Sequence, residues 1–157
     1  MGERNFSFRF MEEALKQAEM AYNEGEVPVG AVIVHDGEVL CADHNRREQN
    51  KDPLAHAEML VIKQASELLG KRRLNDCALY VTLEPCPMCA GAMIMSMLKE
   101  CFFGASDPKH GCCESLYALC SDRAFNHNVQ TLGGIMEDEC KSLLDKFFLE
   151  KRKKKSK

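Results

Sequence analysis

Residues 78–89 read Ala-Leu-Tyr-Val-Thr-Leu-Glu-Pro-Cys-Pro-Met-Cys, an apolar run that passes directly into two closely spaced cysteines. Residues 78–83 have the length and apolar content of a buried strand, and residues 88–98 have those of a helix. Cys86 and Cys89 are therefore expected at a strand-to-helix turn. Because the N-terminus of a helix favours thiolate over thiol, this turn is suited to capturing a metal ion.

A second motif, His56-Ala57-Glu58, opens a helix that we expect over residues 56–69, with Gly70 behind it. One imidazole and two thiolates suit Zn²⁺ and leave one of its four tetrahedral positions free, as in catalytic sites. His-x-Glu followed by Pro-Cys-x-x-Cys is the signature of zinc-dependent cytosine and adenine deaminases. The sequence thus predicts His56, Cys86 and Cys89 as ligands of one Zn²⁺, and Glu58 as the catalytic residue.

The expected chemistry is hydrolytic deamination. Zinc would lower the pKa of a water molecule in its fourth position to about 7, so that hydroxide is available at neutral pH. Glu58 would take the water proton, pass it to a ring nitrogen and later protonate the departing ammonia. Residues two apart do not share a helix face, so we expect either His56 or Glu58 at the helix cap.

A structural zinc site is the competing interpretation of the same cysteines. Such a site needs a fourth protein ligand. The chain offers candidates, but none stands at a second short ligand spacing. These candidates are Cys77, Cys101, His110, Cys112 and Cys113.

The rest of the chain alternates helical with strand patterns, which predicts an α/β layered fold. Asp36-Gly37 is a strong two-residue turn signal and predicts a hairpin formed by residues 29–34 and 38–42. The other expected elements are a first helix over 7–24, strands over 101–105 and around 129–132, a short helix near 115–119, and a final helix over 136–151.

Size and composition indicate one domain in a reducing compartment. The chain has 157 residues, is 45% hydrophobic, and is long enough to bury a core without disulfides. It contains nine cysteines, an odd number, and its first six residues lack the apolar stretch of a signal peptide. No apolar run reaches the ~18 residues of a membrane span. We expect a cytoplasmic protein that neither crosses a membrane nor is exported.

Charge is distributed unevenly along the chain. Residues 151–157 hold six of the 21 basic residues, which leaves residues 1–150 with a formal charge of −9. We expect a single deaminase domain over 1–150 and a disordered basic tail over 151–157. Such a tail can bind phosphates by releasing counterions, in a manner that weakens with salt. A solvated terminus without a partner is the alternative.

At the two motifs the chain resembles the bacterial tRNA-specific adenosine deaminases of the cytidine and deoxycytidylate deaminase superfamily, and the likeness runs over nearly its whole length. The zinc core is common to the superfamily, so the substrate assignment depends mainly on the flanking segments and the last third of the chain. The matching segments are 26–32, 45–46, 52–58, 80–92, 107–109, 126–127 and 147–148.

The resemblance implies a cytidine-deaminase-like fold, a three-layer α/β/α sandwich with a mixed central sheet. It implies a homodimer with one Zn²⁺ per subunit, and a tRNA anticodon stem-loop whose wobble adenosine is flipped into the pocket and converted to inosine. Asn45 would contact the base. The residues that would line the path of the flanking nucleotides are Asp107, Lys109, His127 and Phe148. From the residues alone, Asn45 could instead cap the helix, and Phe148 could belong to the core.

The chain also departs from the family. Residues 111–116 read Gly-Cys-Cys-Glu-Ser-Leu, where relatives have small residues before Gly-Ser-Leu, and this places Glu114 near the expected RNA side. Leu149-Glu150 stands where relatives often have an arginine, so phosphate contacts would pass to Lys151 and Arg152.

Two other functions stay open from the sequence. The same metal cluster would serve a deaminase of a free nucleobase or nucleoside of the guanine or cytosine type, in which the basic tail has no role. A non-catalytic RNA-binding protein with structural zinc is the second alternative, and in that protein Glu58 would be dispensable.

Overall fold

A five-stranded mixed sheet lies at the centre of the molecule, for which the computed structural model describes residues 6–155. The spatial order is β2-β1-β3-β4-β5. β1 pairs antiparallel with both β2 and β3, whereas β3, β4 and β5 are parallel. The strands are β1 (Gly30–His35), β2 (Glu38–His44), β3 (Cys77–Leu83), β4 (Glu100–Ala105) and β5 (Gln130–Leu132).

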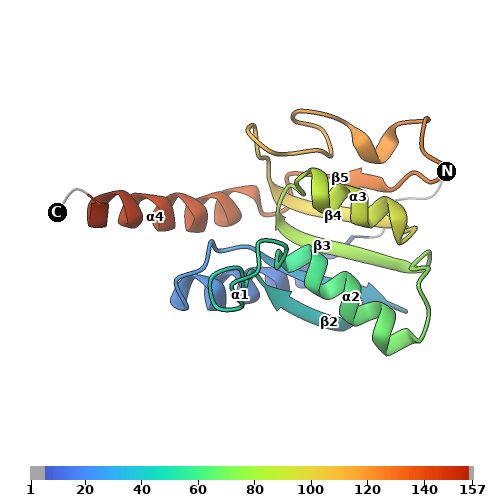
Figure 1. Cartoon of the computed structure of the whole chain (residues 1–157), viewed down its shortest axis with the longest axis horizontal. Helices are drawn as coiled ribbons and strands as arrows, with labels where there is room; N and C mark the ends of the chain where they lie inside the picture. Colours follow the sequence, from blue (N-terminus) through green and yellow to red (C-terminus); the bar gives the residue numbers. More distant parts are fainter. Residues whose placement is uncertain (1–5, 156–157) are drawn as a thin grey trace.

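Helices cover both faces of this sheet. Figure 1 shows α2 and α3 side by side in front of the sheet, whereas α1 lies behind it. α4 packs against α1 and β4 and then extends beyond the sheet. The helices are α1 (Phe8–Asn23), α2 (Ala57–Leu69), α3 (Pro87–Met95) and α4 (Glu137–Lys155), with a 3-10 helix η1 (Leu119–Ser121). The α/β/α sandwich expected from the sequence is confirmed.

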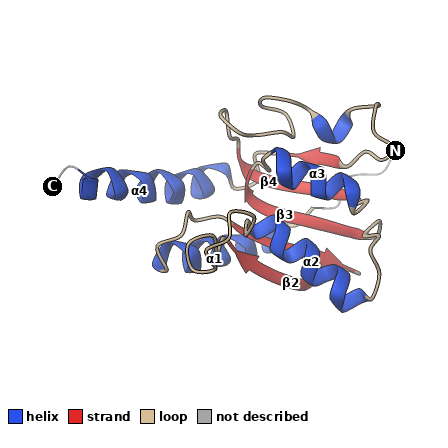
Figure 2. Cartoon of the chain, in the orientation of Figure 1, coloured by secondary structure: helices blue, strands red, loops and turns tan. Residues whose placement is uncertain are grey.

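β3 is the central strand, as its apolar sequence requires. Leu79 and Val81 are completely buried, and Tyr80 packs its ring 4.8 Å from that of Phe102 on β4. A parallel connection needs a crossover, and α3 supplies it between β3 and β4 (Figure 2). The β3–α3–β4 unit therefore fixes the helix that follows the turn with Cys86.

The hairpin predicted at Asp36-Gly37 is present. Asp36 has φ 52° and Gly37 has φ 75°, so both turn residues adopt the left-handed conformation of a type I′ turn. The turn joins β1 to β2 with His35 opposite Glu38. Both strands contact α1 and α2, so the hairpin lies between these two helices in the sandwich.

α3 ends three residues earlier than the apolar pattern predicts. Met97 has φ 59°, its N–H bonds the Ile94 carbonyl, and the N–H of Leu98 bonds the Met93 carbonyl. This is the Schellman arrangement, in which a left-handed residue closes the helix and satisfies its last carbonyls. Leu98 is fully buried because the chain turns back into the core, not because the helix continues.

The end of the chain differs from the expected disordered tail. α4 continues through Lys155, so residues 151–155 are helical, and Ser156 and Lys157 lie outside the described residues. Acidic residues fill the first turn of α4 and basic residues fill its last turn, which favours the helix dipole at both ends. No helix among the described residues is both long and apolar enough to span a membrane.

Candidate metal centre and active site

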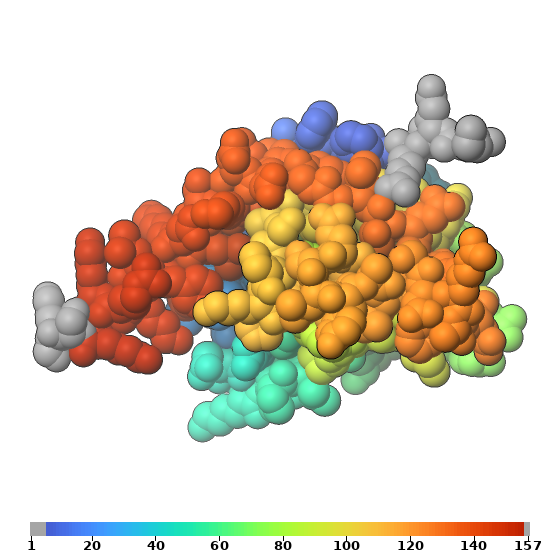
Figure 3. Space-filling view, turned by 90° about the horizontal axis from the view of Figure 1, so that it is seen from above, coloured from blue at the N-terminus to red at the C-terminus, as the bar shows by residue number. Residues whose placement is uncertain are grey.

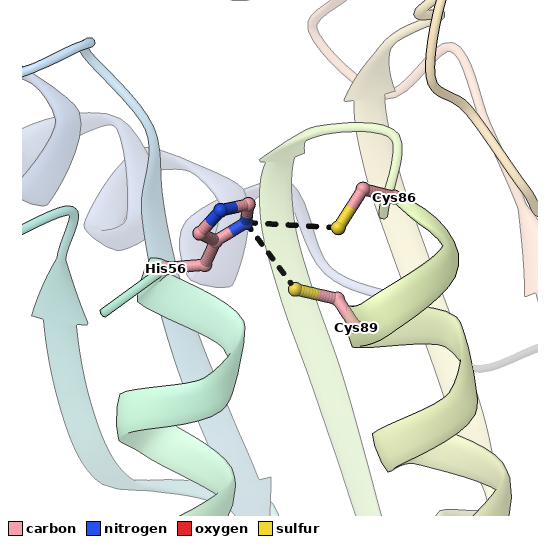
Figure 4. A group of neighbouring side chains, drawn as sticks. All are labelled: His56, Cys86 and Cys89. Carbon is pink, nitrogen blue, oxygen red and sulfur yellow. Dashed lines mark hydrogen bonds between the residues drawn. The ribbon is translucent and has the colours of Figure 1, made fainter. Parts of the chain in front are cut away.

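The two sequence motifs meet where α2 and α3 begin. His56 is the N-cap residue of α2, and Cys86 is the N-cap residue of α3, with Pro87 at the first helical position. Figure 4 shows His56 and the two cysteines pointing toward one another from these two helix ends. Because α2 and α3 pack side by side, residues about 30 positions apart in the chain share one site.

The three predicted ligands are within coordination reach of one another. His56 Nδ1 lies 3.7 Å from Cys86 Sγ and 3.6 Å from Cys89 Sγ, and the three donor atoms fall within 4.8 Å. Within residues 6–155, no fourth His, Cys, Asp or Glu side chain joins this group. One nitrogen and two sulfurs without a fourth protein ligand fit a catalytic metal site better than a structural one.

The cysteines and the histidine share protons. Hydrogen bonds from Cys89 and His56 lower the pKa of Cys86 to about 4 despite its partial burial. The pKa of Cys89 is raised, first by its hydrogen bond to Cys86 and then by burial, and the bond to Cys86 raises the pKa of His56. Cys86 is thus a thiolate held by two donors. A metal ion takes the place of the protons these donors share.

Glu58 lies beside the cluster in the first turn of α2. Its side chain is only 4% exposed, and burial is the main cause that raises its pKa to about 7. His56 caps the helix while Glu58 is helical, so the prediction that the pair divides between cap and helix is confirmed. A carboxyl group that titrates near neutrality can both accept and donate a proton.

Asn45 holds the start of α2. It is 5% exposed, and its Oδ1 accepts a hydrogen bond from the N–H of Ala57 at 2.8 Å. The capping contact considered from the sequence is therefore present. Asn45 also lines a small surface hollow together with Arg47, Phe147 and Lys151. The residues that line this hollow do not include His56, Glu58, Cys86 or Cys89, and Asn45 connects it to the cluster only through its bond with Ala57, the neighbour of His56.

Asp107 and Lys109 lie on the loop between β4 and η1. Asp107 Oδ1 accepts hydrogen bonds from the N–H groups of Lys109 at 3.1 Å and His110 at 3.2 Å, so the carboxylate closes a local turn. The N–H of Cys112 in the same loop bonds the Pro85 carbonyl at 2.8 Å. This bond places the loop directly beside the turn that carries Cys86.

The last two predicted substrate residues lie elsewhere in the chain. His127 Nε2 donates a hydrogen bond to the Leu98 carbonyl at 2.7 Å, at the opposite end of α3 from Cys86. The structure of one chain therefore does not bring His127 to the cluster. Phe148 is 41% exposed on α4 and meets the ring of Phe147 edge-on at 5.4 Å. Phe147, and not Phe148, lines the hollow that contains Asn45.

The sequence analysis did not single out Glu84, which is a buried carboxylate, or Arg47, which lines the hollow together with Asn45. Glu84 is a carboxylate between an apolar strand and a metal-binding turn, and a charge at such a place must find several partners when buried. The position of Glu84 in the sequence could therefore have indicated a buried carboxylate with several hydrogen-bond donors around it. Arg47 stands in a polar stretch with nothing to distinguish it from its neighbours, so only the folded chain reveals its place beside Asn45.

Known proteins resemble this chain in sequence and in fold. A family model described as MafB19-like deaminase matches residues 6–152. A protein of Bacillus subtilis named tRNA-specific adenosine deaminase is 50% identical over 146 residues, which cover 93% of this chain and 91% of that protein.

Two solved structures of deaminases have a similar fold. One, from work on A-to-I editing by tRNA:A34 deaminases at the wobble position of transfer RNA, has a TM-score of 0.85 and 42% identity, over 88% of this chain and 100% of its own. The guanine deaminase of Bacillus subtilis has a TM-score of 0.61 and 38% identity, over 65% of this chain and 66% of its own. The chain therefore belongs to the MafB19-like deaminase family, together with the proteins named tRNA-specific adenosine deaminase.

Proposed function

We propose that this protein deaminates adenosine to inosine at the wobble position of a tRNA anticodon, with one Zn²⁺ per subunit. The observation that carries the proposal is the His56-Cys86-Cys89 cluster beside the buried Glu58, in a chain 50% identical to a tRNA-specific adenosine deaminase. The proposal treats residues 1–150 as one deaminase domain.

The residues divide the chemistry among them. His56, Cys86 and Cys89 would hold the zinc ion, which when bound makes water a nucleophile near neutral pH. Glu58 moves the protons: it accepts one from the attacking water, delivers it to a nitrogen of the purine ring, and protonates the leaving ammonia. Its buried position supports this exchange, because burial keeps the pKa of the carboxyl near 7.

The surface around the cluster would bind the RNA. Asn45, which is hydrogen-bonded to the residue after His56, would contact the flipped base, with Asp107 and Lys109 beside the flanking nucleotides. Sequence-specific RNA recognition uses splayed bases, aromatic surfaces and phosphate contacts. Phe147 and Lys151, which line the hollow that contains Asn45, supply the last two. For His127 and Phe148 the proposal retains a contact with more distant nucleotides of the anticodon loop.

The proposal includes a homodimer that acts in the cytoplasm. Met95 on α3 is 81% exposed and Tyr117 in the loop between β4 and η1 is 66% exposed, and apolar side chains at such a level of exposure support a covering partner. All nine cysteines carry free thiols, which supports a reducing compartment as the place of action.

A free nucleobase is the second candidate substrate. The similarity to the guanine deaminase of Bacillus subtilis favours it, because the two chains are 38% identical over 65% of this chain. Such an enzyme would need only the metal cluster and Glu58, and the basic end of α4 would make no contribution to its activity.

One assay separates these candidates. Purified, zinc-loaded protein is incubated with a tRNA transcript that carries adenosine at the wobble position, and separately with free adenine, guanine, cytosine and cytidine at matched concentrations. Inosine confined to the wobble position supports the proposal. Ammonia released only from a free base replaces the substrate with that base, and silence on all substrates with full zinc content removes the enzymatic function.

A further inference from the structure

Glu84 is a buried carboxylate that the proposed chemistry does not use. It follows β3, precedes Pro85 and Cys86, and is 2% exposed. Burying a carboxylate is costly unless the charge receives hydrogen bonds, so the partners of this side chain indicate what it does.

All of its hydrogen-bond donors belong to one segment, residues 106–115, which follows β4. Glu84 Oε1 accepts from the N–H of Asp107 at 3.0 Å and from the Ser115 hydroxyl. Glu84 Oε2 accepts from the N–H groups of Cys113 at 3.1 Å, Glu114 at 2.8 Å and Ser115 at 2.9 Å. A single side chain thus fastens both ends of the loop.

The sequence predicts a short helix near residues 115–119, whereas the helical residues of this segment are those of η1, Leu119–Ser121. The N–H groups of residues 113–115 bond the Glu84 carboxylate. Burial raises the pKa of Glu84, but the hydroxyl of Ser115 and the backbone N–H groups outweigh it, and the pKa is lowered. In all five of these hydrogen bonds the carboxylate is the acceptor.

The packing around Glu84 leaves no room for a side chain at residue 111. A Cβ atom on Gly111 would fall on the Glu84 carboxylate and would lie 2.6 Å from the Asp107 carbonyl oxygen. The next residue, Cys112, donates its N–H to the Pro85 carbonyl at 2.8 Å. Two consecutive residues, Glu84 and Pro85, therefore hold the loop immediately before the ligand Cys86.

We propose that Glu84 is a positioning residue for the deamination reaction. It ties the 106–115 loop to the turn that carries the zinc ligands, and so sets Asp107 and Lys109 at a fixed place beside the reacting base. The inference rests on the proposed function for its substrate, but the anchoring of the loop stands on the hydrogen bonds alone. The loop that meets the RNA and the turn that meets the metal then act as one rigid unit.

The test is Glu84→Gln in the full-length, zinc-loaded protein. Glutamine has nearly the same shape, but it replaces one acceptor oxygen by an NH₂ group that faces N–H donors, so the loop loses charge-assisted bonds. Trypsin cleavage after the exposed Lys109 should become about tenfold faster. The KM for an anticodon stem-loop should rise about tenfold while kcat changes less than about twofold, because the metal cluster and Glu58 stay in place.

Gly111→Ala reaches the same contact from the other side. It should produce the same gain in cleavage and the same rise in KM, and the double variant should be no worse than the poorer single one, because both changes release one anchor. Glu67→Gln is the matched control, since Glu67 is exposed on α2 and undergoes the same chemical change. It should leave cleavage and kinetics unchanged.

The outcomes are separable. If Glu84→Gln has the cleavage rate and the KM of the wild-type protein, the proposal is overturned. It is also overturned if the variant loses kcat, zinc content and melting temperature to the same extent as its KM rises, because this pattern indicates a purely structural role. Should Glu84→Gln fail to fold, Ser115→Ala removes one donor only and must still speed cleavage at Lys109. If even the wild-type protein is inactive on RNA, the proposed function fails, and the cleavage rates alone decide whether Glu84 anchors the loop.

Discussion

At the scale of single residues, the site depends on where a helix starts. His56 and Glu58 stand two positions apart, yet one is the N-cap and the other lies in the first turn, so their side chains leave the backbone in different directions. The spacing alone predicted this division, because residues two apart on a helix face apart. The ligand set was equally predictable, since its residue types and spacing are a known signature.

Glu58→Gln tests the proton-transfer role directly. The amide keeps the shape of the side chain but cannot exchange protons, so kcat on the anticodon stem-loop should fall by about 10²–10⁴-fold while zinc content stays unchanged. Inosine formation and metal analysis measure the two effects. Activity within a factor of about three of the wild type would remove Glu58 from the mechanism.

Asp76 provides a test of pH-dependent stability away from the site. Its hydrogen bond from Lys71, supported by His35, lowers its pKa to about 2 from the ordinary 3.8. A lowered pKa in the folded state means that the stabilisation is fully present above pH 4 and is lost as the pH falls toward 2.

Asp76→Asn should therefore lower the free energy of unfolding at pH 7 by less than about 1 kcal/mol, since the side chains are partly exposed. The difference between variant and wild type should shrink steadily below pH 4. Urea unfolding at several pH values measures it, and a constant difference from pH 7 to pH 2 would contradict the assigned cause.

At the scale of helices and strands, the sequence predicted those elements whose conformation is determined by residues close to them in the chain. The turn at Asp36-Gly37, the end of α2 at Gly70 and the apolar run of β3 each contain their own cause. The loop at residues 113–118 does not, because its conformation depends on Glu84, about 30 positions earlier. The extension of α4 was missed for a different reason, since a run of basic residues predicts both a solvated end and a favourable helix C-terminus.

Met97 is an unfavourable residue at the left-handed position that closes α3. Its φ of 59° suits glycine, and a side chain there costs about 1 kcal/mol. Met97→Gly should raise the free energy of unfolding by about 0.5–1 kcal/mol, as measured by urea unfolding.

Met95→Gly is the control for that substitution. Met95 is 81% exposed and is the last residue of the same helix, so glycine there should lower the free energy of unfolding by about 0.5–1 kcal/mol. If Met97→Gly destabilises the protein as much as Met95→Gly does, backbone strain is not the reason why α3 ends where it does.

At the scale of the whole molecule, the charge is separated in space as well as in sequence. Figure 3 shows the basic end of α4 at one extremity of the molecule, and Figure 1 shows that this end of the helix extends beyond the sheet. Lys151 on this helix also lines the hollow that contains Asn45. The helix thus extends outward from this hollow, and the proposed function predicts that the phosphates of an anticodon stem follow it.

Removal of residues 151–157 tests that path. The truncated protein should show a higher KM for the anticodon stem-loop and an unchanged kcat, because the metal cluster and Glu58 are retained. The slope of log affinity against log salt should become shallower by about 0.7–0.9 for each phosphate that the truncated protein no longer neutralises. An unchanged salt slope would show that the helix end does not touch the RNA.

The bond network that joins His56, Cys86 and Cys89 has a consequence for handling the protein. A thiolate at neutral pH is the reactive form of cysteine, and Cys86 is half-buried, with a second sulfur one helical turn away. Peroxide or air would attack this pair first, and the sulfenic acid formed on Cys86 would condense with Cys89 into a disulfide. A bound metal ion would therefore also protect these side chains from oxidation, and protein stored without a metal should need a reductant before it can bind one.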